Sequence, residues 1–411
     1  MSSRTPGSLG VYGFRNRADY SYDKLSLANS KAIKVKRLWN LLGEAGKKVI
    51  LIGVPQTYPP QPVNGIMVGD FLTPDIKSDY TYPAGIRDEI RETVGEYLLD
   101  VRDFRTDNKD KILADIYEMT EKRFALARHF VTEKPWDYFM MVEMGTDRIH
   151  HAFWSYMDPL HRSYEKGHRF ENAIFDYYRF IDSQLGKLLK VLDRETHLFI
   201  VSDHGAKRMD GGICVNDWLI QEGYLHLKGP KPDQPTPFSK VQVDWDKTLA
   251  WGDGGYYARI FLNVKGREPR GIIPSSDYEK VRGELAEKIC RVPDDQGRSI
   301  PTRAYSPQEL YRTINGVAPD LLVYWGGLYW RSVGSVGNPS IYTFQNDTGP
   351  DDANHAEHGI MIYRPPAAGD ERMTGSTIPG DARLLDITPT ILSLFGMAPT
   401  AEMEGRPLLL N

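Results

Sequence analysis

Residues 197–205 have the sequence HLFIVSDHG, a short apolar run that leads directly into an aspartate, a histidine and a glycine. The apolar residues do not alternate with polar ones, which is typical of a strand that is covered on both faces. In open α/β sheets, ligands bind beyond the carboxyl ends of the strands. The stretch therefore predicts a buried strand with Asp203 and His204 at a ligand-binding edge. The alternative is a loop acid beside an exposed histidine.

Four more apolar runs predict buried strands, and amphipathic segments between them predict helices. Strands that alternate with helices favour an α/β protein with a mostly parallel central sheet and helices on both of its faces. The strand runs are VILIGV (49–54), YFMMVEM (138–144), DLLVYW (320–325) and GIMIYR (359–364), and the main helical segments are 33–47, 170–192, 276–292 and 386–396.

Two regions fit this alternation less well and predict additions to the core. Residues 56–136 are polar and rich in aromatic side chains, and they contain several helical stretches. Residues 206–300 contain segments rich in glycine and proline, which favour loops and short strands. We therefore expect a core formed by residues 1–205 and 301–411, with a helical insertion at about 56–136, and a cap or insertion region at 206–300.

The bulk composition excludes several classes of protein. The 411 residues carry a formal net charge of -4, so a nucleic acid is not expected as a bulk partner. Two cysteines form no disulfide framework, which favours a reducing compartment. No apolar run is long enough to cross a membrane, and the first ten residues, MSSRTPGSLG, lack the apolar core of a signal peptide. A cytoplasmic location follows as the expectation, and the oligomeric state is left open.

A second polar cluster follows the strand run at 138–144, in the sequence MMVEMGTDRIHHAFW (140–154). If a helix begins here, Asp147 and His151 are four residues apart and lie on one face, where both could bind one ion. His150 is the competing imidazole, but its spacing of three residues fits less well. The alternative is that Asp147 caps the helix and the histidine pair is partly core.

A third cluster, NHAEHGIMIY (354–363), places His355 and His358 just before a strand run. A single histidine of this kind is more often structural, but acids and histidines now flank three predicted strands. A mixed set of Asp and His ligands without thiolates suits Zn²⁺, Mn²⁺ or Fe better than Mg²⁺ or Ca²⁺.

The order of these motifs along the chain resembles that of a known family. Asp-x-x-x-His comes first, then Ser-Asp-His-Gly, then a late His before Gly-Ile. This order resembles the type I phosphodiesterase/nucleotide pyrophosphatase branch of the alkaline phosphatase superfamily. Residues 6–14, 215–225, 265–273 and 384–409 are also similar to segments of that family. The resemblance implies an alkaline-phosphatase-like core and a metal-dependent hydrolase of small-molecule phosphate esters. The bond would be a phosphodiester or a nucleotide pyrophosphate, cleaved by two-metal in-line displacement. Phosphomutases and sulfatases of the same superfamily are alternatives.

The resemblance implies two divalent metal ions, with Zn²⁺ favoured and Mn²⁺ or Fe open. Asp147, His151 and His355 would hold one ion, and Asp203 and His204 would hold the other. His355 is preferred to His358 because the family's late ligand stands four residues before the glycine that opens the last strand. His358 and His150 are then neighbours or alternative ligands.

The family's second position also needs an Asp at the end of the first strand and a Thr or Ser nucleophile, and both precede the Pro-Gly segment. That segment begins here at Pro6, so we expect the first strand to be missing and the nucleophile to lie upstream of Met1. Ser2, Ser3 and Thr5 stand too close to the Pro-Gly turn to match. Two explanations stay open: a longer natural N-terminus, or an inactive truncated product that serves as a binding module.

The cap region contains aromatic residues in a glycine-rich stretch. Tyr256, Tyr257 and Trp251 could stack on a base or ring of a substrate, although packing within the cap is the simpler interpretation.

Overall fold

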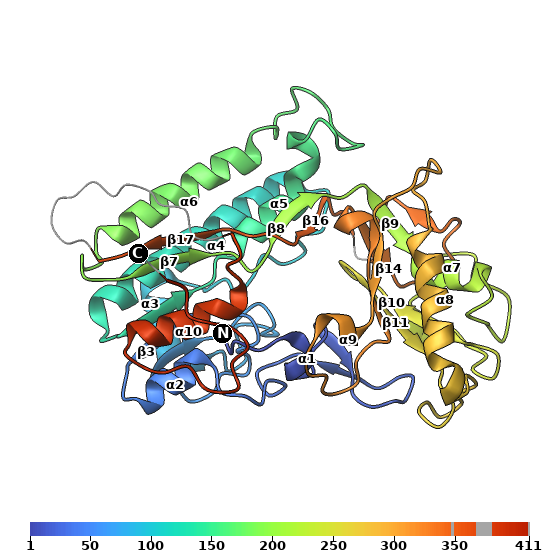
Figure 1. The fold of residues 1–411 in the computed structure, drawn as a ribbon. Helices are drawn as coiled ribbons and strands as arrows, with labels where there is room; N and C mark the ends of the chain where they lie inside the picture. Colours follow the sequence, from blue (N-terminus) through green and yellow to red (C-terminus); the bar gives the residue numbers. More distant parts are fainter. Residues whose placement is uncertain (347–348, 367–379, 410–411) are drawn as a thin grey trace.

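The computed structural model describes residues 1–346, 349–366 and 380–409. Two lobes stand side by side in Figure 1, and the ribbon of β8 and β16 runs between them. The first lobe contains a sheet in the order β5-β4-β3-β6. Strands β3 (Val49–Ile52), β4 (Gly65–Val68) and β6 (Tyr138–Met141) run parallel, and the short β5 (Thr81–Tyr82) is antiparallel to β4.

The side chains of β3 alternate between two helical layers. Val49 and Leu51 belong to one apolar cluster with residues of α2 (Leu38–Glu44) and α10 (Leu384–Leu394). Ile50 and Ile52 belong to another, with residues of α3 (Ile86–Val94) and α4 (Lys109–Glu133). Because successive side chains of a strand point to opposite faces, β3 is buried from both sides. The prediction of an α/β fold with helices on both sheet faces is confirmed.

The sheet is interrupted beyond β6. Strand β7 (Leu198–Val201) pairs antiparallel with β17 (Met361–Arg364), and these two form a separate sheet. Among the residues that the structure describes, no backbone ladder joins β6 to β7. In the described part of the chain, the predicted central sheet is therefore divided into two parts, one around β3 and one formed by β7 and β17.

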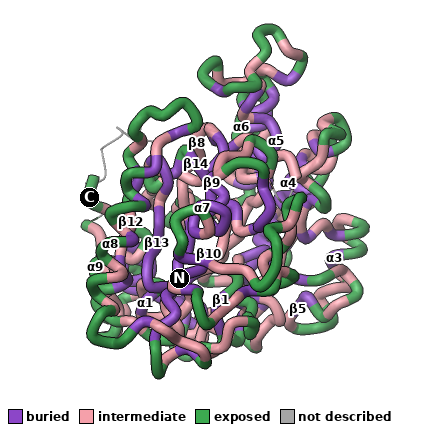
Figure 2. The backbone as a smooth tube through the Cα atoms, turned by 90° about the vertical axis from the view of Figure 1, so that its right-hand side faces the viewer, coloured by how far each residue is buried: buried purple, intermediate pink, exposed green. Residues whose placement is uncertain are grey.

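The second lobe is built around antiparallel strands in the order β10-β11-β13-β12 and a three-stranded sheet, β14-β9-β15. They enclose the largest apolar cluster, and Figure 2 shows their buried segments as purple stretches surrounded by green turns. The elements are α7 (Val215–Gln221), α8 (Tyr278–Cys290), β9 (Gly211–Cys214), β10 (Ala250–Asp253), β11 (Ala258–Leu262), β12 (Arg303–Tyr305), β13 (Leu321–Tyr324), β14 (Trp330–Val333) and β15 (Tyr342–Thr343).

Two local expectations need correction. The run 320–325 forms strand β13 as predicted, but β13 pairs with β11 and β12 in the second lobe. The proposed boundary at residue 300 therefore passes through this sheet, and the division into domains stays a prediction. Helix α2 begins at Leu38 instead of near residue 33, because the Asn40 side chain accepts the backbone N–H of Arg37 and ends the preceding loop there.

The remaining elements hold the lobes and the site in place. No helix in the described part of the chain is long and apolar enough to cross a membrane. The elements are α1 (Pro6–Leu9), β1 (Arg15–Arg17), β2 (Leu25–Leu27), α5 (Gly145–Met157), α6 (Ala173–Leu189), β8 (Gly205–Arg208), α9 (Pro307–Leu310) and β16 (Ala353–Ala356).

The layer of α3 and α4 over the sheet provides a stability prediction. Phe130 of α4 is fully buried in the cluster with Ile50 and Ile52. Phe130→Ala is expected to lower the free energy of unfolding by about 3–5 kcal/mol, because the neighbours only partly refill the cavity. Phe175→Ala on α6 is the matched control, since Phe175 is exposed and its loss should change little. Urea unfolding followed by circular dichroism measures both, and equal effects of the two changes would contradict this packing.

Candidate metal centre

Asp147 is placed by a tight strand-to-helix junction. Strand β6 ends at Met141 and α5 begins at Gly145, so Asp147 lies in the first turn of the helix. A Cβ on residue 145 would lie 1.8 Å from the Tyr177 hydroxyl, which explains the glycine. The Glu143 side chain accepts the Gly145 N–H at 2.8 Å and fixes the turn. Negative side chains are favoured at helix N-termini, so this position also suits a carboxylate.

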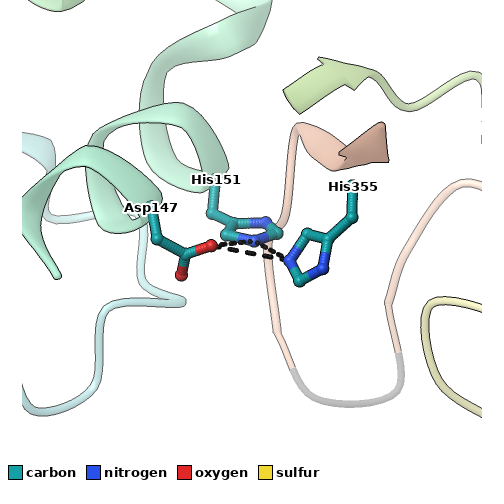
Figure 3. Close-up of side chains that lie close together, drawn as sticks. All are labelled: Asp147, His151 and His355. Carbon is teal, nitrogen blue, oxygen red and sulfur yellow. Dashed lines mark hydrogen bonds and ion pairs between the residues drawn. The ribbon is translucent and has the colours of Figure 1, made fainter. Parts of the chain in front are cut away.

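Three of the five expected ligands converge in the structure. Asp147 and His151 extend from one face of α5, and His355 reaches them from β16 (Figure 3). Asp147 Oδ1 lies 3.3 Å from His151 Nε2 and 3.5 Å from His355 Nε2, and the two nitrogens are 3.3 Å apart. Zn²⁺ bonds of about 2.0–2.1 Å place tetrahedral ligand atoms roughly 3.3–3.4 Å apart. The three atoms therefore match one face of a tetrahedral site.

The protonation of these groups reflects their mutual contact. Burial would raise the pKa of Asp147, but the charge and hydrogen bond of His151, with His355 and Arg148, hold that pKa well below its usual value. Burial would lower the pKa of His151, but the charges of Asp351 and Asp147 raise it well above its usual value. Burial and the charge of His204 lower the pKa of His355. A carboxylate stabilised among imidazoles is the charge pattern that a bound cation would also favour.

Asp351 contacts His151 on the side of the ring that faces away from Asp147 and His355. The sequence analysis did not name this residue. Its Oδ1 lies 2.6 Å from His151 Nδ1, and its Oδ2 accepts a hydrogen bond from Arg105 at 3.1 Å. Because Nδ1 faces Asp351, Nε2 is the nitrogen that faces Asp147 and His355. This is the arrangement in which a carboxylate fixes the tautomer of a metal-binding histidine. The only sequence signal was an acidic pair, Asp351 and Asp352, which stand four and three residues before His355.

His204 and Asp203 reach the cluster through the ribbon of β8 and β16. His355 pairs with Ala206 in this ribbon, which brings the preceding residues beside it. The rings of His204 and His355 stack with centroids 3.6 Å apart, and His204 Nε2 lies 3.9 Å from Asp147 Oδ1. Asp203 is more peripheral, with a side chain 80% exposed and Oδ1 3.8 Å from His204 Nε2. The structure thus places His204 against the first three residues, and Asp203 beside His204 at an exposed position.

The two alternative histidines lie apart from the convergence point. His150 Nε2 lies 3.2 Å from the Tyr178 hydroxyl, and the His150 ring packs edge-on against Trp154. Burial lowers the pKa of His150 to about 4, so it is neutral at physiological pH. His358 is exposed in the turn that follows β16. Among the described residues, the group of close ligand atoms consists of Asp147, His151 and His355.

The second lobe contributes one aromatic residue to the site. The Tyr256 ring stacks on His355 with centroids 3.8 Å apart, and its hydroxyl lies 3.3 Å from His151 Nε2. Trp251 instead packs in the apolar cluster of the second lobe, and the Tyr257 hydroxyl donates to the backbone carbonyl of Tyr12 at 2.6 Å. Of the three aromatic residues named from the sequence, only Tyr256 therefore faces the candidate site.

The N-terminal hydroxyls have structural partners elsewhere. The Ser3 hydroxyl donates to the Leu385 carbonyl at 2.7 Å, and the Thr5 hydroxyl donates to Glu404 at 3.0 Å. Thr5 also caps α1. These contacts tie the start of the chain to the segment around α10.

Comparison with known proteins shows the family to which the chain belongs. The family model of type I phosphodiesterase / nucleotide pyrophosphatase matches residues 1–351. The chain belongs to this family. It is therefore a phosphodiesterase/nucleotide-pyrophosphatase-like hydrolase of the alkaline phosphatase superfamily. None of the curated protein sequences matches the chain.

Two solved structures are among those to which the chain was matched. Phosphonoacetate hydrolase from Sinorhizobium meliloti 1021, solved in complex with phosphonoacetate, is 12% identical, with a TM-score of 0.57 over 94% of this chain and 80% of its own. Murine ectonucleotide pyrophosphatase/phosphodiesterase 5 is 14% identical, with a TM-score of 0.48 over 97% of this chain and 82% of its own. At this level of identity, the likeness to the bacterial hydrolase supports the type I phosphodiesterase fold and says nothing of the substrate.

Proposed function

We propose that the protein hydrolyses phosphodiester or nucleotide pyrophosphate bonds of small molecules with a divalent metal held by Asp147, His151 and His355. The observation that carries the proposal is the triangle of ligand atoms with sides of 3.3, 3.3 and 3.5 Å. Three protein ligands leave one tetrahedral position open, as in catalytic zinc sites. Two imidazoles and one carboxylate favour Zn²⁺, and Mn²⁺ and Fe are the alternatives.

A second ion at Asp203 and His204 is part of the same proposal. His204 lies beside the first group, and Asp203 lies beside His204. These two side chains supply only two ligands, so further groups must complete the position. In two-metal sites, the ions stabilise the attacking and leaving oxygens of an in-line displacement. Among the residues that the structure describes, we assign the attacking hydroxyl to none.

The residues around the site have separate roles in this proposal. Asp351 keeps His151 oriented, with Nε2 toward the cluster. The Tyr256 hydroxyl, 3.3 Å from both that nitrogen and Arg105, is placed to donate a hydrogen bond to a phosphoryl oxygen. Stacking of Tyr256 on His355 couples the second lobe to the site. The second lobe therefore binds and orients the substrate, while α5 and β16 provide the ligands.

Metal removal and reloading test the function. The protein is stripped with a chelator, and hydrolysis of bis(p-nitrophenyl) phosphate is measured after addition of Zn²⁺, Mn²⁺, Fe²⁺ or Mg²⁺. Restored cleavage that is lost in His355→Ala and reduced in Asp203→Ala supports the proposal. Cleavage that neither substitution changes would contradict it. Faster cleavage of p-nitrophenyl sulfate would favour a sulfatase, and metal binding without turnover would favour a binding module.

The Tyr256 hydroxyl provides a finer prediction. Tyr256→Phe is expected to leave metal content unchanged and to lower kcat/KM about 2- to 12-fold, the value of one neutral hydrogen bond of about 0.5–1.5 kcal/mol. Tyr257→Phe is the matched control, because that hydroxyl faces the Tyr12 backbone and not the cluster. Steady-state kinetics of both variants measure the effect, and an unchanged kcat/KM in Tyr256→Phe would remove this residue from the substrate site.

A further inference from the structure

Tyr256 brings one side chain of the second lobe to the candidate metal centre. It follows β10, its ring stacks on His355 at 3.8 Å with 28° between the ring planes, and its hydroxyl lies 3.3 Å from His151 Nε2. A hydrogen bond weakens steeply when its geometry is disturbed, and a displacement of about 1 Å at a reacting centre can cost about 100-fold in rate. The value of this hydroxyl therefore depends on where the backbone of residue 256 is held.

Contacts within the second lobe fix the backbone just ahead of Tyr256. Gly255 and Ser332 exchange two backbone hydrogen bonds of 2.9 Å. Asn216 of α7 is buried, and its side chain donates to the carbonyl of Gly252 at 2.9 Å and accepts the N–H of the same residue at 2.8 Å. These bonds attach the segment to α7 and β14, which both belong to the second lobe. They do not by themselves set the distance from this segment to the candidate ligands on α5 and β16.

Asn354 of β16 provides a contact that crosses between the lobes. Its side chain is fully buried. Its Nδ2 donates to the carbonyl of Tyr256 at 3.3 Å, and its Oδ1 accepts the backbone N–H of His355 at 2.8 Å. One amide group thus contacts the backbone of the aromatic residue and the backbone of a candidate metal ligand.

The two contacts explain why residue 354 carries an amide. A carbonyl oxygen needs a donor and a backbone N–H needs an acceptor, and Asn and Gln carry both at the two ends of one planar group. Aspartate would place an acceptor against the Tyr256 carbonyl. Leucine, which is similar in size, would leave two buried backbone groups unpaired, at a cost of about 1–3 kcal/mol for each.

A side chain that only satisfies its surroundings is the alternative, and Asn338 is an example of it. Asn338 is also buried, and its Nδ2 donates to Asp217 Oδ2 at 2.7 Å and to the Ser335 carbonyl at 3.2 Å. Neither partner belongs to the candidate metal centre, so this amide stabilises a loop of the second lobe. Asn354 differs, because both of its partners belong to that centre.

We propose that Asn354 is a positioning residue, which ties the backbone of Tyr256 to that of His355 and so holds the Tyr256 ring and hydroxyl against the metal centre. The position of the ring depends on these contacts alone, whereas the use of its hydroxyl in catalysis rests on the proposed hydrolase function. The position and the use are therefore tested by separate measurements.

The position of the Tyr256 ring can be measured without metal or turnover. A stacked aromatic ring shifts the NMR signals of the protons that it covers, so the His355 ring signals of the metal-free, histidine-labelled chain report the stack. His355→Ala identifies these signals, and Tyr256→Leu gives the shift for complete loss of the ring. Asn354→Ala is expected to move them in the same direction as Tyr256→Leu, and Asn338→Ala to leave them in place. His355 signals that stay in place in Asn354→Ala would overturn the proposal.

A second variant keeps the test valid if the alanine variant does not fold. Asn354→Ser keeps a hydroxyl for the His355 N–H, but its side chain is one atom shorter and presents one polar atom instead of two. The same shift of the His355 signals is expected, with a smaller loss of Tm. Unmoved signals in this variant would also contradict the tie to Tyr256.

A double-mutant cycle measures whether Asn354 acts through Tyr256. Asn354→Ala is expected to keep the bound metal and to lower kcat/KM about 2- to 12-fold, as Tyr256→Phe does, because each weakens the same hydrogen bond. In the Tyr256→Phe background, Asn354→Ala should lower kcat/KM by less than about 2-fold, the scatter of independent changes. Asn338→Ala, measured below its Tm, should leave kcat/KM unchanged. Equal losses from Asn354→Ala in both backgrounds, or loss of its bound metal, would overturn the proposal.

Failure of the proposed function gives a different pattern. A chain that cleaves no phosphodiester with any of the added metals would reject the hydrolase function, and the His355 signals would then decide alone whether Asn354 holds the Tyr256 ring. Cleavage together with unmoved His355 signals would retain the function and make Asn354 a packing residue.

Discussion

Asp147→Asn is expected to release the bound metal and to lower kcat/KM. The loss should exceed the roughly 10- to 100-fold that is typical when a residue hydrogen-bonded to a metal ligand is changed. Asp147 Oδ1 is the vertex that both imidazole nitrogens face, and its carboxylate supplies the negative charge of the three-ligand group. Asparagine keeps the size and hydrogen bonding of the side chain but removes this charge. Metal content after dialysis, measured by mass spectrometry, and hydrolysis of bis(p-nitrophenyl) phosphate measure the two effects.

The control for this change is Asp176→Asn, at an exposed position of α6. It removes the same charge from the chain without touching the cluster, so metal content and kinetics should be those of the unchanged protein. A variant Asp147→Asn that keeps its full metal content would show that the carboxylate is a helix-capping group and not a ligand.

Asp351→Asn is expected to weaken metal affinity about 10- to 100-fold, although Asp351 does not belong to the group of ligand atoms. The carboxylate lies 2.6 Å from His151 Nδ1 and stabilises the orientation in which Nε2 faces the cluster. An amide at this position can still accept the ring N–H, but its weaker charge makes His151 a poorer ligand. Titration of the metal-free protein with Zn²⁺ in competition with a chromogenic chelator gives the affinity directly.

The effect of Asp351→Asn on the stability of the whole protein must be separated from its effect on the orientation of the His151 ring. Asp351 also contacts Arg105 and Arg331, so the asparagine variant should have a lower Tm as well. Asp352→Asn is the neighbouring control, because Asp352 accepts from the Ser155 hydroxyl and lies outside the cluster. Comparable losses of stability in both variants, with weaker metal binding only in Asp351→Asn, are the expected pattern. Equal metal affinity in both variants would mean that Asp351 has a structural role alone.

The strands and helices of the first lobe could be predicted because their signals are local. The apolar run 49–54 forms a strand that is buried on both faces, as predicted. The run 197–202 also forms a strand, but β7 is only half-buried and Val201 is exposed, so the prediction of full burial was wrong there. The place of β13 could not be predicted in this way, since a buried strand of either lobe has the same composition. The start of α2 at Leu38 coincides with a hydrogen bond from the Arg37 backbone N–H to the Asn40 side chain, which the apolar periodicity does not reveal.

The residues of the candidate site also differ in whether a local sequence signal predicts them. Asp147 and His151 are four residues apart on one helix, so their common face follows from the helical repeat. His355 joins them through the pairing of β16 with β8, and its place was expected from the family resemblance instead of from spacing. Asp351 and Tyr256 reach the site through tertiary contacts. Their local signals, an acidic pair and an aromatic residue in a glycine-rich stretch, do not show which residues they contact.

The central claim is that Asp147, His151 and His355 hold a divalent metal ion. Crystals grown with Zn²⁺, with anomalous data collected on either side of the zinc absorption edge, test it directly. The account predicts a peak about 2.0–2.2 Å from Asp147 Oδ1, His151 Nε2 and His355 Nε2, and its loss in His355→Ala. A protein that binds zinc elsewhere, with no peak between these three atoms, would contradict it.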